Sequence, residues 1–255
     1  MSFNRKIESI SKNPYTIFKI ENFLNQNLYE EIENNFPLIS DNLLNNYYKD
    51  MDRGKFWFHS DDILYQELKQ KYNCMKKLEE IVFSEKFFRF FYYNFFVAFF
   101  KSVDFKQFLK RLRIPKILID KEKMKTKNFF FNYVRPRIEY SYLTNGAYLR
   151  PHVDSKAKLL SLMLYFPNNS EKFDIKSEKN FGTQFWLNKE ANPKNYHIND
   201  IDKFEKTSSK YYKSSFEKNL LVGFVRNKYS WHSLEKIECQ REYVRRSINI
   251  NFFVR

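Results

Sequence analysis

Two side chains in the segment RPHVD are suited to holding a metal ion. His152 and Asp154 lie two residues apart. On an extended strand, residues i and i+2 point to the same side, so the imidazole and the carboxylate would be presented together. A second imidazole would complete a 2-His-1-carboxylate face, which binds iron and leaves three octahedral positions open. A His-X-Asp triplet alone is more often an ordinary surface pair, so the second imidazole decides the matter.

His232 is the candidate for that second imidazole. The chain has four histidines, and His232 lies in RNKYSWHSLEKI, directly after the apolar segment NLLVGFVR. Taken alone, it is equally compatible with a structural histidine beside Trp231. His59 and His197 fall outside the predicted barrel strands, and we expect them to be dispensable for metal binding.

The last apolar segment, 244–254, carries a polar face. Its odd positions include Arg245, Ser247 and Asn249, whereas its even positions are apolar after Arg246. The polar face could simply meet water. Alternatively, it lines a polar interior that binds a small dicarboxylate, because arginine offers a planar fork of donors that matches a carboxylate.

Strands and helices that could position these residues follow from the apolar pattern. A helix is predicted after Asn25, with apolar residues at four-residue spacing, and it ends at Pro37. Helical patterns also dominate 66–113, whereas 40–65 is loop-like and 188–218 is a polar excursion long enough to be a mobile lid. Strands are predicted at 15–20, 129–143, 158–166, 181–187, 219–226 and 244–254.

Early helices followed by late strands predict an α+β chain whose C-terminal half is a sandwich or barrel. We expect one domain over residues 1–255, with a mainly helical support region at 1–127 and the strand-rich core at 128–255. The 255 residues suffice for a sizeable core.

The charge is strongly basic, with a formal net charge of +15. The stretch 101–127 holds ten Lys and Arg against three acidic residues. Such a surface attracts nucleic acid or acidic substrates, but no nucleic-acid motif accompanies it, and a solvated helix face is the simpler explanation.

Location and assembly are only weakly indicated. Two cysteines make no disulfide framework, so a cytoplasmic setting is expected. The aromatic run 87–100 is too short to span a bilayer, which needs roughly 20 apolar residues. It is predicted to be a buried or partly buried helix. A role of this helix as the contact surface of a homodimer is an alternative.

Several segments together resemble a known family. The order GAYLRPHVD, LSLMLYFP, FGTQFW, LLVGFVRNKYSWHSL and RRSINI resembles the Fe(II)/2-oxoglutarate-dependent oxygenases, in particular the prolyl 4-hydroxylase-like branch. The opening NPYTIFKIENFLNQNLYEEIENNFP is similar to the first strand and helix of that branch. The resemblance covers about 130–255 well and the first 40 residues loosely, and 41–125 carries no family signal.

The resemblance implies a double-stranded β-helix, a jelly roll of the cupin type, with a helical N-terminal extension packed on one sheet. It places iron on His152, Asp154 and His232, with 2-oxoglutarate and O₂ as cosubstrates. It places the distal carboxylate of 2-oxoglutarate on Arg245, in the family's Arg-X-Ser pattern with Ser247. The gap from His232 to Arg245 is somewhat long for this branch, and Gly182 stands alone where many members have two glycines.

Two tyrosines and the type of reaction also follow from the resemblance. Tyr165 is implied as a second contact to the distal carboxylate, and Tyr142 as a cosubstrate or substrate contact. Packing in the core is at least as good an explanation of both. Related halogenases lack the metal-bound carboxylate, so Asp154 favours hydroxylation or another oxidation over halogenation. We also expect Tyr148 and Trp186 to line the barrel mouth.

The leading hypothesis is therefore a dioxygenase that hydroxylates an unactivated C–H bond of a small molecule, a glycan or a peptidyl residue, releasing succinate and CO₂. A nucleic-acid demethylase and a non-catalytic basic binding protein are the alternatives. The sequence does not reveal the substrate.

Overall fold

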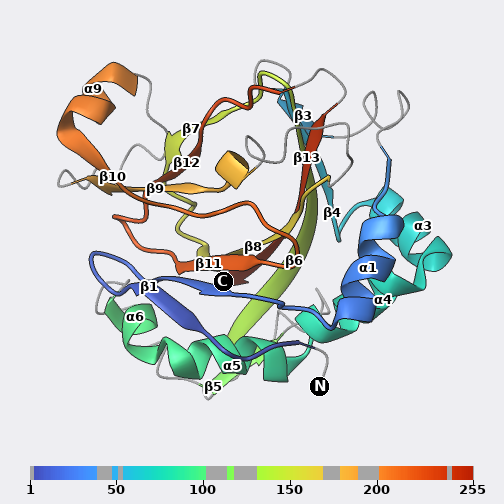
Figure 1. Ribbon diagram of the computed structural model, residues 1–255. Coiled ribbons are helices and arrows are strands. Elements are labelled where there is room, and N and C mark those ends of the chain that lie inside the picture. Colours follow the sequence, from blue (N-terminus) through green and yellow to red (C-terminus); the bar gives the residue numbers. More distant parts are fainter. Residues whose placement is uncertain are drawn as a thin grey trace.

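Two β-sheets and a layer of helices make up the computed structural model (Figure 1). It describes residues 3–38, 48–50, 54–101, 114–117, 131–168, 179–188, 201–239 and 243–254. The basic stretch 101–127 lies outside them, apart from residue 101 and 114–117.

The larger sheet has nine strands, in the order β1-β2-β11-β8-β13-β6-β4-β3, with β5 added in parallel to β6. They are β1 (Glu8–Ser11), β2 (Ile17–Ile20), β3 (Tyr48–Asp50), β4 (Lys55–His59), β5 (Ile114–Ile117), β6 (Phe131–Thr144), β8 (Lys158–Phe166), β11 (Leu221–Val225) and β13 (Val244–Val254).

The smaller sheet has the order β10-β9-β12-β7 and faces the larger one (Figure 1). Its strands are β7 (Leu149–His152), β9 (Gln184–Asn188), β10 (Ser208–Lys213) and β12 (His232–Leu234). A buried apolar cluster shared by both sheets, including Tyr165, Phe185 and Phe224, holds them together.

Helices cover the outer face of the larger sheet (Figure 1). They are α1 (Gln26–Asn34), α3 (Ile63–Lys71), α4 (Asn73–Val82), α5 (Glu85–Asn94) and α6 (Phe96–Lys101). Their apolar sides join the even positions of β13 in one large core, in which Phe252 contacts the rings of Phe87 and Phe88. Burying such aromatic surfaces is the main source of stability for this layer.

Several predicted elements are found as expected. Helix α1 begins after Asn25, whose side chain accepts a hydrogen bond from the Asn27 amide and so caps the helix. Strands β8 and β13 occupy the predicted ranges 158–166 and 244–254. A turn at Asn145-Gly146 follows β6, with Gly146 at φ +82°, a conformation that favours glycine.

The prediction for 40–65 was wrong, and 188–218 holds elements that were not predicted. The range 40–65, read as loop-like, contains β3 and β4, which extend the larger sheet. These strands are three and five residues long, too short to stand out as an alternating pattern. The polar excursion 188–218 contains helix α9 (Ile201–Thr207) and β10, which pairs with β9, while 189–200 lies outside the described residues.

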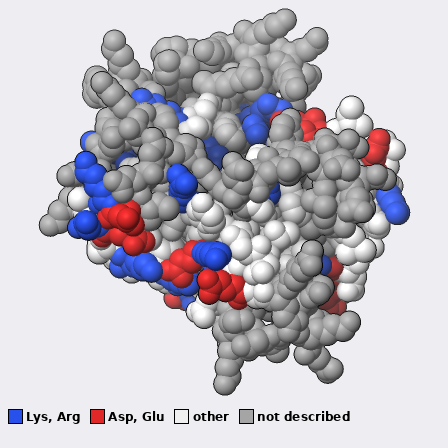
Figure 2. Space-filling view, turned by 90° about the horizontal axis from the view of Figure 1, so that it is seen from above, with Lys and Arg blue, Asp and Glu red and all other residues white. Residues whose placement is uncertain are grey.

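The surface shows mixed charge where the structure describes it. On the face seen in Figure 2, basic and acidic side chains lie side by side. Glu235, for example, pairs with Lys210 at 2.8 Å and with Lys213 at 2.6 Å. Within the described part of the chain, no helix is long and apolar enough to cross a membrane.

Candidate metal centre

The three predicted metal ligands lie together on the smaller sheet and the loop beside it. Strand β7 ends at His152, and the antiparallel strand β12 begins at His232, which pairs directly with His152. The two imidazole rings are 4.2 Å apart between centroids. Asp154 follows two residues after His152, and potential ligand atoms of all three side chains lie within 4.8 Å of one another. Such a cluster can hold one metal ion.

Backbone carbonyls fix the tautomers of both histidines. The Nδ1 atom of His152 is 2.8 Å from the Arg150 carbonyl oxygen, and that of His232 is 3.0 Å from the Ser230 carbonyl oxygen. A carbonyl can only accept, so each Nδ1 carries the proton and each Nε2 keeps its lone pair. This outer hydrogen bond is the usual arrangement of metal-binding histidines. The donor set therefore fits a divalent iron ion.

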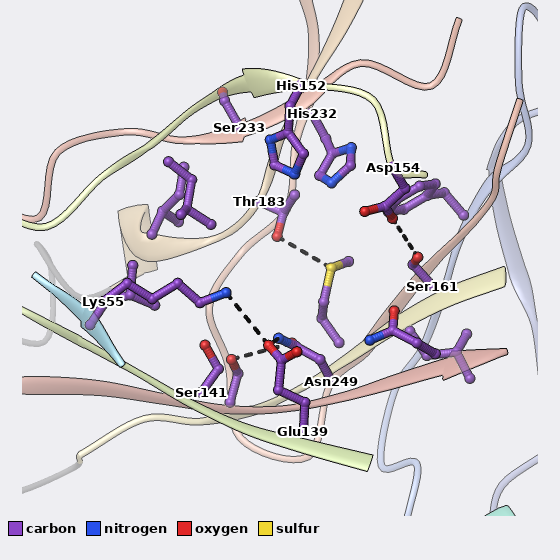
Figure 3. A pocket seen from close by; sticks show the side chains of 18 of the residues that line it. Lys55, Glu139, Ser141, His152, Asp154, Ser161, Thr183, His232, Ser233 and Asn249 are labelled. Atoms are coloured by element: carbon purple, nitrogen blue, oxygen red, sulfur yellow. Dashed lines mark hydrogen bonds and ion pairs between the residues drawn. The ribbon is translucent and has the colours of Figure 1, made fainter. Parts of the chain in front are cut away.

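Asp154 is held by two side chains. Lys158 Nζ donates to Oδ1 at 2.8 Å. Ser161 Oγ donates to Oδ2 at 2.7 Å (Figure 3). Burial would raise the pKa of this carboxyl group, but the Lys158 ammonium and the two imidazoles outweigh burial and hold the pKa well below its usual range. Asp154 is therefore ionised and oriented, as a metal ligand must be.

The imidazoles are held neutral. Burial, with the neighbouring His232 adding to it, lowers the pKa of His152 to about 3. Burial also lowers the pKa of His232, although Asp154 opposes the shift. Neutral imidazoles beside an ionised carboxylate are the protonation states that bind a metal, so little proton release would accompany binding at neutral pH.

A cavity of about 130 Å³ adjoins the three ligands and lies between the sheets. Figure 3 shows the imidazoles on one side of it and Glu139, Ser141 and Asn249 on the other. Arg245 and Ser247 also line it.

Arg245 is a buried cation in this cavity, 4 % exposed. Its Nε donates to the Phe181 carbonyl at 2.7 Å, and one terminal nitrogen donates to Ser247 Oγ at 3.3 Å. Within the described residues it forms no ion pair with a carboxylate. Burial lowers the pKa of the guanidinium, yet arginine remains charged in proteins. A buried charge without a counter-ion is costly, so this position suits an anionic ligand.

Tyr165 lies behind Arg245 and does not line the cavity. The Arg245 guanidinium carbon is 5.2 Å from the centre of the Tyr165 ring. The tyrosine hydroxyl is hydrogen-bonded to Thr183 Oγ1 at 2.9 Å and to Ser214 Oγ at 3.0 Å. Gly182 permits this packing, because a Cβ there would lie 1.8 Å from the Ser214 carbonyl oxygen.

Tyr142 is on the wrong side of the sheet for a ligand contact. Its hydroxyl donates to the Pro37 carbonyl at 2.9 Å, and its ring stacks on Phe56 with centroids 5.0 Å apart. The cavity side of β6 carries the odd positions Glu139, Ser141 and Leu143. Because neighbouring residues of a strand point to opposite faces, Tyr142 faces the helices.

The expected aromatic mouth is also absent from the described cavity lining. Tyr148 and Trp186 line a second hollow of about 350 Å³, which shares Leu149, Ser233 and Leu234 with the cavity. Trp186 packs with Val153, Phe204 and Trp231. A place for these two residues at the mouth of the cavity therefore stays a prediction.

Sequence reasoning missed a polar cluster on the cavity wall. Glu139 Oε1 accepts a hydrogen bond from Asn249 Nδ2 at 2.9 Å and lies 3.5 Å from Lys55 Nζ (Figure 3). Burial would raise the pKa of Glu139, but Lys55 and then Lys158 outweigh burial and lower it. The alternation of Glu139 and Ser141 in the predicted strand was a usable signal, whereas Lys55 lay in the segment read as loop.

Known proteins give limited similarity to this chain. No family model matches it, and no curated protein matches it. Among solved structures, a prolyl-4-hydroxylase from Pseudomonas putida is 12% identical, with a TM-score of 0.44, over 95% of this chain and 94% of that one. HygX from Streptomyces hygroscopicus, with nickel, 2-oxoglutarate and hygromycin B bound, is 8% identical, with a TM-score of 0.46, over 93% and 82%. IDO from Bacillus thuringiensis is 10% identical, with a TM-score of 0.41, over 94% and 90%. At such identities and TM-scores, these similarities assign no function.

Proposed function

We propose that the protein is an Fe(II)- and 2-oxoglutarate-dependent dioxygenase that hydroxylates an unactivated C–H bond. The observation that carries the proposal is one cavity lined by both a His-Asp-His cluster and a buried arginine without a carboxylate partner among the described residues. The cluster matches the face that binds iron in such enzymes, and the arginine matches the distal carboxylate of the cosubstrate.

Three of these residues would bind the metal, and two others would position the carboxylate ligand. His152 and His232 would bind iron through Nε2, and Asp154 through a carboxylate oxygen, while Lys158 and Ser161 keep that carboxylate in place. When bound, iron, 2-oxoglutarate and O₂ together supply the oxidation of the substrate, with release of succinate and CO₂.

The cosubstrate would be anchored away from the metal. Arg245 would bind its distal carboxylate, with Ser247 holding the guanidinium. The Tyr165 ring, packed against that guanidinium, restricts its movement. Tyr165 thus positions Arg245, and Tyr142 has no part in the site.

The cavity size favours a small target. About 130 Å³ is less than the roughly 300–1,000 Å³ of usual small-molecule sites. Because iron and 2-oxoglutarate would share this space, the room for substrate suits only a small molecule or a single peptidyl side chain. The basic stretch 101–127, which motivated a nucleic-acid substrate, lies largely outside the described residues.

The test is metal- and cosubstrate-dependent turnover. Anaerobically purified protein should bind one Fe(II) per chain, and under air it should convert 2-oxoglutarate to succinate. His232→Ala and Asp154→Ala should abolish this conversion while the circular dichroism spectrum stays unchanged.

His59→Ala is the matched control. His59 lies at the end of β4, where Nδ1 is 3.4 Å from Asp62 Oδ1, and it is not part of the cluster. Its loss should leave iron binding and turnover at the wild-type level. Full iron-dependent turnover in His232→Ala would refute the assigned ligands.

A further inference from the structure

Lys55 is a second cation on the cavity wall, in the same transverse row of the larger sheet as Arg245. In the sheet register, Lys55 of β4 pairs with Leu143 of β6, and Leu143 pairs with Arg245 of β13. Adjacent strands are about 4.8 Å apart, so the two cationic residues start roughly 10 Å from one another. All three residues line the cavity.

The Lys55 ammonium is only loosely paired. Its contact with Glu139 Oε1 is 3.5 Å long, and its Nζ lies 4.8 Å from the centre of the Trp57 ring. By comparison, Lys158 approaches Asp154 to 2.8 Å. An ammonium has three donors, and charged hydrogen bonds are normally about 2.7–2.9 Å long. Lys55 therefore has donor capacity directed at the cavity (Figure 3).

Glu139 is better satisfied than Lys55. Its Oε1 accepts the Asn249 amide at 2.9 Å in addition to the long Lys55 contact. The carboxylate is thus held by two donors and does not depend on Lys55 alone. An anion arriving from the cavity could bind Lys55 without stranding Glu139, because Asn249 would still donate to it.

The net charge of the described cavity lining also favours binding of an additional anion. Three cations, Lys55, Lys158 and Arg245, face two carboxylates, Glu139 and Asp154. A divalent iron and the dianionic cosubstrate of the proposed function would cancel one another. One positive charge then remains uncompensated in a partly enclosed space, where net charge is unfavourable unless it is paired.

We propose that Lys55 binds a carboxylate group of the substrate, so that the enzyme acts on a small carboxylate-bearing compound. This inference rests on the proposed function, which assigns Arg245 to the cosubstrate and leaves Lys55 for the substrate. Lys55 is then a specificity-determining residue, with Glu139 and Asn249 positioning it.

The test measures carboxylate binding to protein loaded with zinc and saturated with 2-oxoglutarate. Zinc takes the same ligand types without redox chemistry, and saturation keeps the probe off Arg245. The probes are butyrate, standing for a free acid, and a capped aspartate, standing for a peptidyl acid. Butyramide is the uncharged control. Binding is followed by ligand-observed NMR titration. Butyrate, the capped aspartate or both should bind wild type about tenfold or more tightly than butyramide.

A matched pair of variants isolates the charge of Lys55. Glu139→Gln removes the carboxylate alone, and Lys55→Met with Glu139→Gln removes both charges, so neither variant strands a buried carboxylate. Glu139→Gln should bind the preferred acid at least as tightly as wild type does. The double variant should lose about tenfold or more in that affinity. Calorimetric affinity for 2-oxoglutarate should stay within about twofold in both variants.

The outcomes separate this inference from the proposed function. Equal binding of both acids and butyramide to wild type would overturn the inference even if the double variant failed to fold. Loss of 2-oxoglutarate affinity in the double variant alone would make Lys55 a cosubstrate contact and also overturn it. Absence of 2-oxoglutarate binding in wild type would instead overturn the proposed function.

Discussion

The two faces of strand β13 differ in character: one lines the cavity with polar side chains, and the other packs apolar side chains into the main core. The cavity face carries Arg245, Ser247, Asn249 and Asn251. The helix face carries residues of the main core, among them Ile248, Ile250 and Phe252, each 0 % exposed. Adjacent residues of this strand therefore differ in environment while sharing the same hydrogen-bonded ladder.

The contrast shows how the sheet divides stability from binding. On the helix face, side chains gain free energy by leaving water and filling space. On the cavity face, polar groups are held in a partly enclosed space where unpaired groups are costly. Substitutions of neighbouring residues should therefore separate into losses of stability and losses of affinity.

The largest expected effect is on the helix face. Phe252→Ala should lower the free energy of unfolding by about 3–5 kcal/mol, because it leaves a cavity against Phe87 and Phe88. Urea denaturation measures the change. The neighbouring Asn251→Ala should cost about 1 kcal/mol or less, because Asn251 faces the cavity. Equal losses in both variants would contradict the division between the two faces.

The next effect is on the cavity face. Arg245→Ala should weaken 2-oxoglutarate binding by about 2–5 kcal/mol, or roughly 30- to 5,000-fold, because a buried carboxylate loses its charged partner. The absorption band of the anaerobic iron chelate reports the affinity. Unfolding free energy should change far less than in Phe252→Ala. A small effect on affinity would mean that the distal carboxylate is anchored elsewhere.

Much of this contrast could be predicted from the sequence, because polar and apolar residues of β13 alternate from Ser247 to Phe252. A long strand with one apolar face defines its own register. The spacing of His152 and Asp154 similarly indicated a shared side before any fold was known. These signals are local, and local periodicity is what a sequence displays directly.

What could not be predicted depends on pairing between distant segments. Lys55 enters the cavity only because β4 pairs with β6, and the five residues of β4 gave no clear alternation. Tyr142 was assigned through the family resemblance, although the alternation of β6 places its side chain on the other face of the sheet from Ser141. The face of β6 could have been predicted from Glu139 and Ser141, but which face meets the cavity depends on the assembled sheet.

Acid should expose a further difference between the cavity lining, which includes His152 of β7, and the helix face of β13, in protein freed of metal by a chelator. The pKa of His152 is about 3 when folded and near 6.5 when unfolded. Between these values the unfolded chain binds more protons, so stability is complete above pH 6.5 and falls as pH falls towards 3. From pH 7 to pH 5, His152 should cost about 2 kcal/mol.

Chemical denaturation at both pH values measures this loss, and His152→Asn should reduce it. Ile250→Val on the helix face is the control. It should lower the unfolding free energy by about 0.5–1.5 kcal/mol at either pH and leave the pH dependence unchanged. An undiminished acid loss in His152→Asn would show that other groups cause it.

The smallest effect concerns the arginine beside Arg245. Arg246 faces the helices, with its guanidinium carbon 5.1 Å from the centre of the Phe36 ring. Burial lowers the pKa of its guanidinium, and Glu33 opposes that shift. Its Nε has no hydrogen-bond partner among the described residues.

Arg246→Ala should therefore cost about 1 kcal/mol of unfolding free energy, from the lost ring contact and the lost packing of the stem. Arg246→Met, which keeps the stem, should cost less. In both variants 2-oxoglutarate affinity should stay within about twofold, because neither changes the cavity face. If Arg246→Ala weakened 2-oxoglutarate binding more than Arg245→Ala, the register of β13 would be one residue off and the two faces would be exchanged.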